Sequence, residues 1–321
     1  MDVANFFKKF SRGMEYLHHL YVFGAFASVI YVITKDSNES SGPMGIYYLV
    51  AVSVYLLIIL ILLIANTILN SKKVRYAEAI HSQHQAIHLS RNTYRYLDCC
   101  HRSDHKVQFS KAHFTSLIEG VLTAANSAFE ISSGVKCRTS IKLIGALKGT
   151  DGSSLDHMYV STLARDAVSK KNREMYDKDE GTKHILSKNS DFSILANMKQ
   201  PYFFNGDISK LDLYENTSNG ESHGASNTKL SYNSAIVFPI RYVLTRDDIE
   251  LEPGNGGALG DQVLYGFFTV DSLPRNSFSE RYDIQLGGAI ADALFPVLDM
   301  YRKVRALETS LQSTQKDCAN L

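Results

Sequence analysis

The feature that most constrains this chain is a long uncharged segment near its N-terminus. From Ile46 to Ala65 there are 20 residues without a charged side chain, and 14 of them are Leu, Ile or Val. A helix of this length crosses a hydrocarbon core of about 30 Å. At about 0.3–0.6 kcal/mol per centrally placed Leu or Ile, insertion is favoured by roughly 4–8 kcal/mol. The segment therefore predicts a transmembrane helix over residues 46–69.

A weaker apolar run precedes this segment and predicts a first transmembrane helix over residues 15–34. The two spans would form a hairpin joined by residues 35–45. A buried core helix is one alternative, and a cleaved signal peptide is another, because Ala25–Ala27 resembles a small-residue cleavage site. The apolar run continues past Ala27, which favours an uncleaved anchor.

Flanking charge predicts the orientation of the hairpin. Three cations precede the first span and three follow the second, whereas the loop between the spans has one Lys against two acidic residues. By the positive-inside rule, both termini face the cytoplasm of a bacterial inner membrane, and residues 35–45 form a periplasmic loop. Residues 1–14, with Phe and Lys together, are expected to be cytosolic or to lie along the membrane interface. The flanking cations are Lys8, Lys9, Arg12, Lys72, Lys73 and Arg75.

Two helical surfaces are candidates for contact and coupling. Gly24 and Ser28 stand four residues apart on the first span, so their side chains are small enough for another helix to approach closely. The alternative is that this face meets lipid and makes no helix contact. Residues 70–105 predict a helical linker with apolar side chains on a four–three spacing. This linker is either a coiled coil that couples the membrane helices to the domain in a homo-oligomer, or an amphipathic helix packed on the domain. Its coupling candidates are Ile80, Ile87, Tyr94 and Leu97.

Beyond residue 105 the pattern predicts an α+β domain with an antiparallel sheet and flanking helices. A helix over 109–131 comes first, and a helix from residue 280 to about 307, with Pro296 expected to kink it, comes last. Residues 306–321 predict a polar tail. The expected strands are 136–146, 158–164, 234–242 and 262–271, with a short helix at 191–198 and an extended stretch at 201–207.

Composition and motifs predict no catalytic site, no metal site and no cofactor, so we expect that the chain is not an enzyme. The 34 basic and 33 acidic residues offer no basic patch for direct nucleic-acid binding. The 4 cysteines show no disulfide framework. His81, His84 and His88 share one helix face, for which a metal or proton-sensing role is the alternative to a solvated face. The glycine-rich segment 253–260 lacks the ending of a phosphate-binding loop.

The order of elements over residues 106–305 resembles a GAF domain. The resemblance rests on Ser190–Ala196 leading into Gln200–Asp207, on Ser234–Ile240, and on Leu264–Ser272 followed by Phe278-Ser279-Glu280. It implies a GAF-like fold and a role in sensing or signal coupling through helices. It names no ligand, and the ligand-binding residues are left unknown.

The whole architecture, with two spans, a linker and one cytosolic domain, resembles the two-span membrane effectors of bacterial antiphage defence, including those encoded beside retron reverse transcriptases. The leading hypothesis is therefore an abortive-infection effector, a toxin that perturbs the inner membrane when its domain is released or activated. Its partners would be the lipid bilayer, further copies of the chain, and a regulatory complex of reverse transcriptase with nucleic acid. The alternative is a membrane-tethered GAF sensor that binds a small molecule and signals to a partner protein.

Overall fold

The computed structural model describes residues 24, 43–102, 108–147, 154–173, 183–211, 214–216, 232–243 and 262–319. The chain divides into two compact units, Met1–Lys72 and Lys73–Leu321. The predicted first span lies outside the described residues apart from Gly24. The hairpin of two spans therefore stays a prediction.

Helix α2 runs from Pro43 to Arg102 without interruption and contains the predicted second span. Among the described residues it is the one helix long and apolar enough to cross a membrane, by length and composition. Its large apolar side chains are exposed, with Tyr55 at 65% and Leu62 at 63%. Exposed apolar surface on this scale suits a lipid environment better than water.

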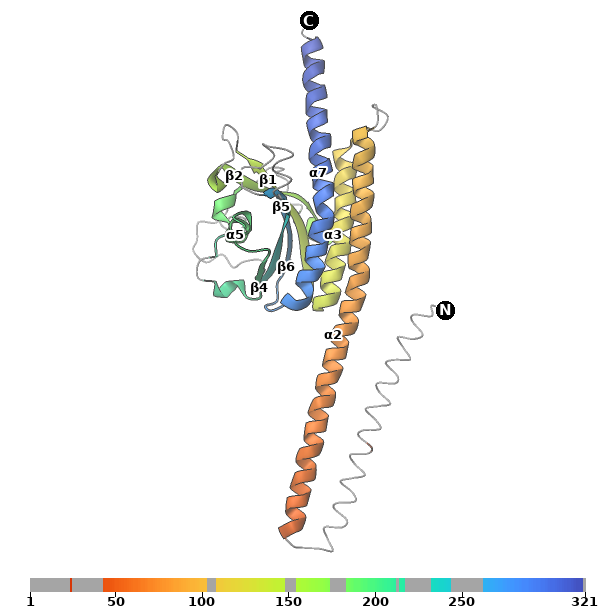
Figure 1. Cartoon of the computed structure of the whole chain (residues 1–321), viewed down its shortest axis with the longest axis vertical. Coiled ribbons are helices and arrows are strands. Elements are labelled where there is room, and N and C mark those ends of the chain that lie inside the picture. The colour runs from red at the N-terminus through yellow and green to blue at the C-terminus, as the bar shows by residue number, and fades with distance from the viewer. Residues whose placement is uncertain are drawn as a thin grey trace, which may run out of the picture. The chain divides into compact units, whose positions relative to one another are not determined.

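The second unit is an α+β domain built on one antiparallel sheet of six strands, in the order β3-β2-β1-β6-β5-β4 (Figure 1). Its central strands are β1 (Cys137–Ala146), β5 (Ser234–Val243) and β6 (Gln262–Ser272). The outer strands are β2 (Met158–Arg165), β3 (His184–Ile185) and β4 (Phe203–Asn205). The helices are α3 (Lys111–Ser133), α4 (Ala167–Arg173), α5 (Ser190–Ala196) and α7 (Glu280–Ala319), with 3₁₀ turns η1 (Leu155–His157), η2 (Leu186–Lys188) and η3 (Ile208–Lys210).

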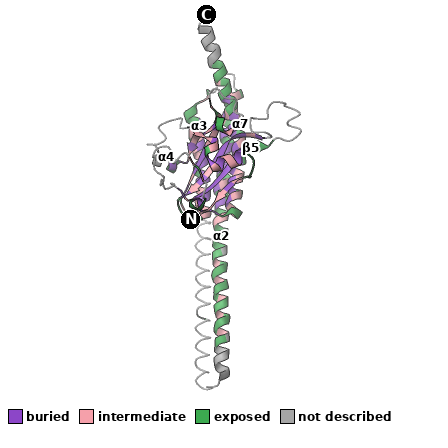
Figure 2. Ribbon diagram, turned by 90° about the vertical axis from the view of Figure 1, so that its left-hand side faces the viewer, coloured by how far each residue is buried: buried purple, intermediate pink, exposed green. Residues whose placement is uncertain are grey.

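The sheet has a buried core on each face because side chains alternate along its strands. On β5, Ile236, Phe238 and Ile240 join the core beneath α3 and α7, whereas Ala235 and Val237 join the core on the face that carries α5. Helix α2 lies against α3 and α7 through residues 73–102 (Figure 1). Figure 2 shows the buried residues gathered within the domain. One face of the sheet is thus covered by helices, and the other is left for shorter segments and a pocket.

Glycine permits close packing at two positions in this domain. A Cβ at Gly266 would lie 2.0 Å from the carbonyl oxygen of Lys142 on the neighbouring strand β1. A Cβ at Gly287 on α7 would lie 2.1 Å from the ring of Phe238. These two glycines allow β6 to pair with β1 and α7 to seat on β5.

The structure confirms the α+β class and the antiparallel sheet, and the four predicted strands match β1, β2, β5 and β6 to within one residue at each end. It adds α4 and β3, which the sequence pattern did not indicate. Helix α7 continues through Pro296 to Ala319 instead of ending near residue 307, so most of the predicted polar tail is helical.

Candidate functional site

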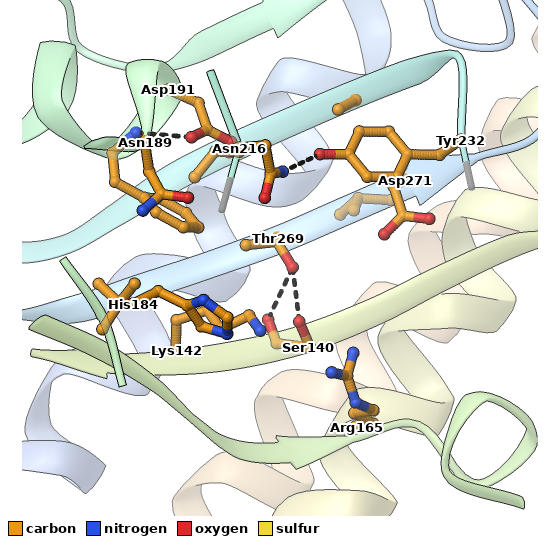
Figure 3. A pocket seen from close by; sticks show the side chains of 15 residues that line it. Ser140, Lys142, Arg165, His184, Asn189, Asp191, Asn216, Tyr232, Thr269 and Asp271 are labelled. Carbon is orange, nitrogen blue, oxygen red and sulfur yellow. Dashed lines mark hydrogen bonds between the residues drawn. The ribbon is translucent and has the colours of Figure 1, made fainter. Parts of the chain in front are cut away.

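A polar pocket lies on the face of the sheet that the long helices leave open. It is formed by β1, β2, β3, β5, β6 and the segments around α5, and it has a volume of about 60 Å³. By this measure one water needs about 10–15 Å³, so the pocket has room for several. In Figure 3, Asp191 lies on one side, Lys142, His184 and Ser140 lie on the other, and Thr269 lies between them.

Asp191 is the buried acid of the pocket. It stands in the first turn of α5 and is only 3% exposed. Its Oδ1 accepts a hydrogen bond from the backbone N–H of Phe192 at 2.9 Å, and its Oδ2 accepts one from the hydroxyl of Tyr214 at 3.1 Å. Burial removes water from the carboxylate and raises the pKa of Asp191 to about 6. The carboxyl can therefore accept a hydrogen bond from a ligand or take up a proton near neutral pH.

Two tyrosines extend this acid into a hydrogen-bonded network. The hydroxyls of Tyr214 and Tyr232 lie 3.0 Å apart, and the side-chain amide of Asn216 donates to Tyr232. Burial, followed by the nearby charge of Asp191, raises the pKa of both tyrosines above the ordinary phenol value. Both hydroxyls thus stay protonated and serve as neutral hydrogen-bonding groups at neutral pH.

Cations line the opposite side of the pocket. Lys142 on β1 donates from Nζ to Oγ1 of Thr162 at 2.6 Å, and Arg165 on β2 contributes its guanidinium to the lining. The positive charge of Lys142 favours the ionised form of Asp191, which offsets part of the burial effect on its pKa. His184 on β3 supplies a third basic side chain.

The floor between the two sides is made by short polar side chains on the central strands. The hydroxyls of Ser140 and Thr269 lie 2.7 Å apart across β1 and β6. Beside them Asp271 forms an ion pair with Arg138, so its charge is already compensated within the protein. The pocket thus presents a buried acid, a basic wall and hydroxyl groups, an arrangement suited to binding a small polar molecule.

The described residues contain no group of three or more His, Cys, Asp or Glu side chains placed to hold a metal ion. Of the three histidines singled out by the sequence, His84 and His88 pair, with their Nε2 atoms 2.8 Å apart. Arg91 contacts the other ring nitrogen of His88. Desolvation and then the charge of Arg91 lower the pKa of His88.

The residues that the sequence predicts as interface and coupling positions differ in how far the structure buries them. Gly24 is an exposed helical residue, and Ser28 lies outside the described residues. Leu97 is fully buried in the core shared with α3 and α7, whereas Ile80 is 45% exposed and Ile87 is half-buried. Tyr94 packs against the edge of that core.

The stripe by which α2 packs on the domain consists mainly of small residues. Side chains on it are at most 9% exposed, and their spacing of three or four residues places them on one helix face. Small side chains let two helices approach closely, because interaxial distance depends on the residues at the contact. A search for large apolar residues misses such a stripe. Its members are Ala79, Ser82, Ala86, Ser90, Thr93 and Leu97.

The pocket residues were also missed by sequence analysis, which left the ligand-binding positions unknown. They come from positions 140 to 271, on five strands, helix α5 and the loops beside them, so no local spacing joins them. The one available signal was the start of the predicted helix at Ser190-Asp191-Phe192, which the GAF resemblance included without giving Asp191 a role.

No family model matches the sequence, and no curated protein does. Similar solved structures include the GAF domain of a phosphoenolpyruvate-protein phosphotransferase from Acinetobacter, at 13% identity and a TM-score of 0.35, covering 68% of this chain and 97% of that one. A type II free methionine-R-sulfoxide reductase from Thermoplasma acidophilum is 16% identical with a TM-score of 0.34, covering 59% of this chain and 94% of that one. The bacteriophytochrome RpBphP3 from R. palustris is 12% identical with a TM-score of 0.30, covering 71% and 40%. These similarities assign neither a family nor an activity to the chain.

Proposed function

We propose that this chain is a membrane-anchored, GAF-like sensor whose domain binds a small polar molecule in the pocket around Asp191. The observation that carries the proposal is the pairing of a buried carboxylate with a basic wall on the open face of the sheet. Burying a charged group costs stability unless it is paired and hydrogen-bonded, and titratable groups perturbed in this way cluster at functional sites. A protein that keeps them around a cavity is expected to use them for a ligand.

The charges of the pocket define the class of ligand. Lys142 and Arg165 suit a carboxylate or phosphate group, because charge-assisted hydrogen bonds to such groups are the strong ones. Asp191, with the hydroxyls of Tyr214 and Tyr232 beside it, suits a hydrogen-bond donor on the same molecule. The expected ligand therefore has an acidic group at one end and an N–H or O–H donor at the other.

The test is the recovery of a small molecule from the full-length protein. The wild-type chain is purified in lipid discs and denatured, and the released compounds are identified by mass spectrometry. Lys142→Met removes a pocket cation, and Lys170→Met is the matched control, because Lys170 lies on α4 and pairs with Glu119 outside the pocket.

We expect a compound that accompanies the wild type and the Lys170→Met variant but not the Lys142→Met variant. Equal recovery from all three proteins would count against the pocket. So would an empty wild type that no small carboxylate or phosphate stabilises against heat.

A second candidate function is the membrane-perturbing effector. It is favoured by the continuity of α2, which contains the apolar segment and also contributes Ala79, Ala86 and Leu97 to the domain core. A change of state in the domain would then act on the membrane segment of the same helix. Rapid depolarisation and dye entry in cells expressing the full chain, absent for a chain lacking residues 1–70, would support this function.

Intact membranes at verified expression would favour the sensor alone. In cells that do depolarise, replacing both Gly24 and Ser28 by Leu is expected to abolish toxicity without lowering membrane insertion, because the added side chains would block close helix approach. The role in antiphage defence and the reverse transcriptase partner stay predictions. A reverse transcriptase gene beside the gene for this chain would favour them, and a kinase or cyclase gene would favour the sensor.

A further inference from the structure

One end of the domain gathers cations from four separate segments. We propose that this basic end, formed by Lys73, Arg75, Lys136, Lys210, Arg275 and Arg281 around Leu273, lies on the headgroups of anionic lipids. The inference goes beyond ligand binding in the pocket and rests on the proposed membrane anchor.

The segments of the basic end are held together by specific contacts. On α2, the guanidinium of Arg75 lies beside Gly134 at the C-terminus of α3, where an added Cβ would come within 2.5 Å of Nη1. The hydroxyl of Ser272 at the end of β6 donates to the carbonyl of Lys136 at 2.8 Å. The rings of Tyr76 on α2 and Tyr282 on α7 are 4.9 Å apart. The cations therefore share one end of the domain.

The turn after β6 presents an apolar side chain at this end. Leu273 is 62% exposed, although its carbonyl accepts a hydrogen bond from the amide of Asn233 at 2.7 Å. Three residues later the backbone N–H of Asn276 donates to the carbonyl of Gly206 at 2.7 Å. The backbone of the turn is thus fixed while its leucine points away from the core, an arrangement typical of surfaces that meet a partner or a membrane.

The exposed charge at this end is mainly positive. Five of its cations are exposed, namely Lys73, Lys136, Lys210, Arg275 and Arg281, against the exposed carboxylates of Glu78 and Glu280. Asp207 lies 3.3 Å from both Arg275 and Lys210, so it compensates one of these two cations and the exposed positive excess is smaller than the count of cations. Two further nearby acids are not exposed: buried Asp283 accepts from Ser132 and from the backbone of Ser279, and half-buried Glu130 accepts from the backbone of Cys137.

A lipid surface is the expected partner because the basic end follows the apolar segment directly along α2. Arg75 follows the exposed apolar residue Ile68 by seven residues on the same helix, which is about 10 Å at 1.5 Å per residue. A bilayer that holds the apolar segment therefore places its headgroups within reach of Lys73 and Arg75. Clusters of Lys and Arg directly cytoplasmic of a membrane helix are attracted to anionic lipid, and an exposed leucine among them can enter the interface.

The sequence supplies a clean reporter for this contact, because the chain contains no Trp. Leu273→Trp places the only Trp of the protein at the basic end. Val168→Trp is the matched control on α4, where Val168 is 64% exposed, and Leu57→Trp marks the apolar segment. Each full-length variant is reconstituted into phosphatidylcholine vesicles with or without phosphatidylglycerol, and quenching by lipids with brominated acyl chains is measured.

We expect Leu273→Trp to be quenched in vesicles with phosphatidylglycerol nearly as strongly as Leu57→Trp, and to lose most of that quenching in phosphatidylcholine alone. Adding Lys136→Glu and Arg281→Glu to Leu273→Trp should also remove it, with the circular dichroism unchanged. Quenching no greater than that of Val168→Trp would overturn the proposal and leave an anionic protein as the partner. Equal quenching in both lipids would overturn the recognition of anionic lipid. An unquenched Leu57→Trp would instead refute the membrane anchor.

Discussion

Replacing Asp191 by Asn is expected to stabilise the domain at neutral pH. Burial raises the pKa of Asp191 from its ordinary value of 3.8 to about 6. A difference of roughly 2 pH units, at about 1.4 kcal/mol per unit, corresponds to about 3 kcal/mol of folding free energy that the ionised carboxylate costs. For a domain of this size that is a rise of roughly 6–12 °C in melting temperature for the variant.

The sign of the effect depends on pH. Because the pKa of Asp191 is higher in the folded state, the folded protein binds the proton more tightly. The contribution of this group to stability is fully present below about pH 4 and is lost as the pH rises to about 6. The advantage of Asp191→Asn should therefore be large at about pH 7 and nearly absent at about pH 4.

The assay is thermal unfolding of the full chain in detergent, followed by circular dichroism on both sides of that titration. Asp292→Asn is the control, because Asp292 is an exposed carboxylate on α7. It should change little at either pH. A destabilised Asp191→Asn variant at neutral pH, or one whose difference from wild type does not vary with pH, would refute the account of a buried, costly carboxylate.

Packing gives three further predictions, each measured as the change in free energy of unfolding. Gly266→Ala should cost about 3–5 kcal/mol, because the new methyl would meet the carbonyl of Lys142, and a loss under about 1 kcal/mol would contradict the close strand approach. Ala86→Leu should cost about 1–3 kcal/mol, because Ala86 is fully buried between helices, and a neutral result would mean that α2 does not pack there. Ile80→Ala should change stability by no more than about 0.5 kcal/mol, because Ile80 is 45% exposed, and a larger loss would place it inside an interface.

Much of the fold could be predicted because its central strands obey simple rules. β5 and β6 are apolar runs bounded by polar loops, and β6 ends at Ser272, directly before the turn at Pro274. The two-residue strand β3 could not be predicted, since two residues define no alternation and its existence depends on pairing with β2. The length of α7 was underestimated, because Pro296 and the polar residues after Leu307 are ordinary signs of a helix end.

Local sequence patterns could predict neither the face by which α2 packs nor the pocket, and the reasons differ. In α2, the large apolar residues Ile80 and Ile87 predict a contact face that lies beside the face actually buried, which contains Ala79 and Ala86. Sequence periodicity cannot reveal which of two neighbouring faces meets a partner. The pocket depends on tertiary structure altogether, because Lys142 faces Asp191 only after β1 and α5 are brought together by the sheet.

The central claim is that α2 anchors the domain in a membrane, and alkaline extraction of cell membranes tests it most directly. The full-length wild type is compared with a chain that lacks residues 1–42, and therefore the predicted first span, and in which Leu57 and Ile61, both more than half exposed in the apolar segment, are replaced by Arg. Each Arg near the centre of a span opposes insertion by about 2.5–3.5 kcal/mol, so the pair should offset most of the driving force. The account predicts that the wild type stays with the membranes and that the double variant is released. Release of the wild type into the alkaline supernatant would contradict it.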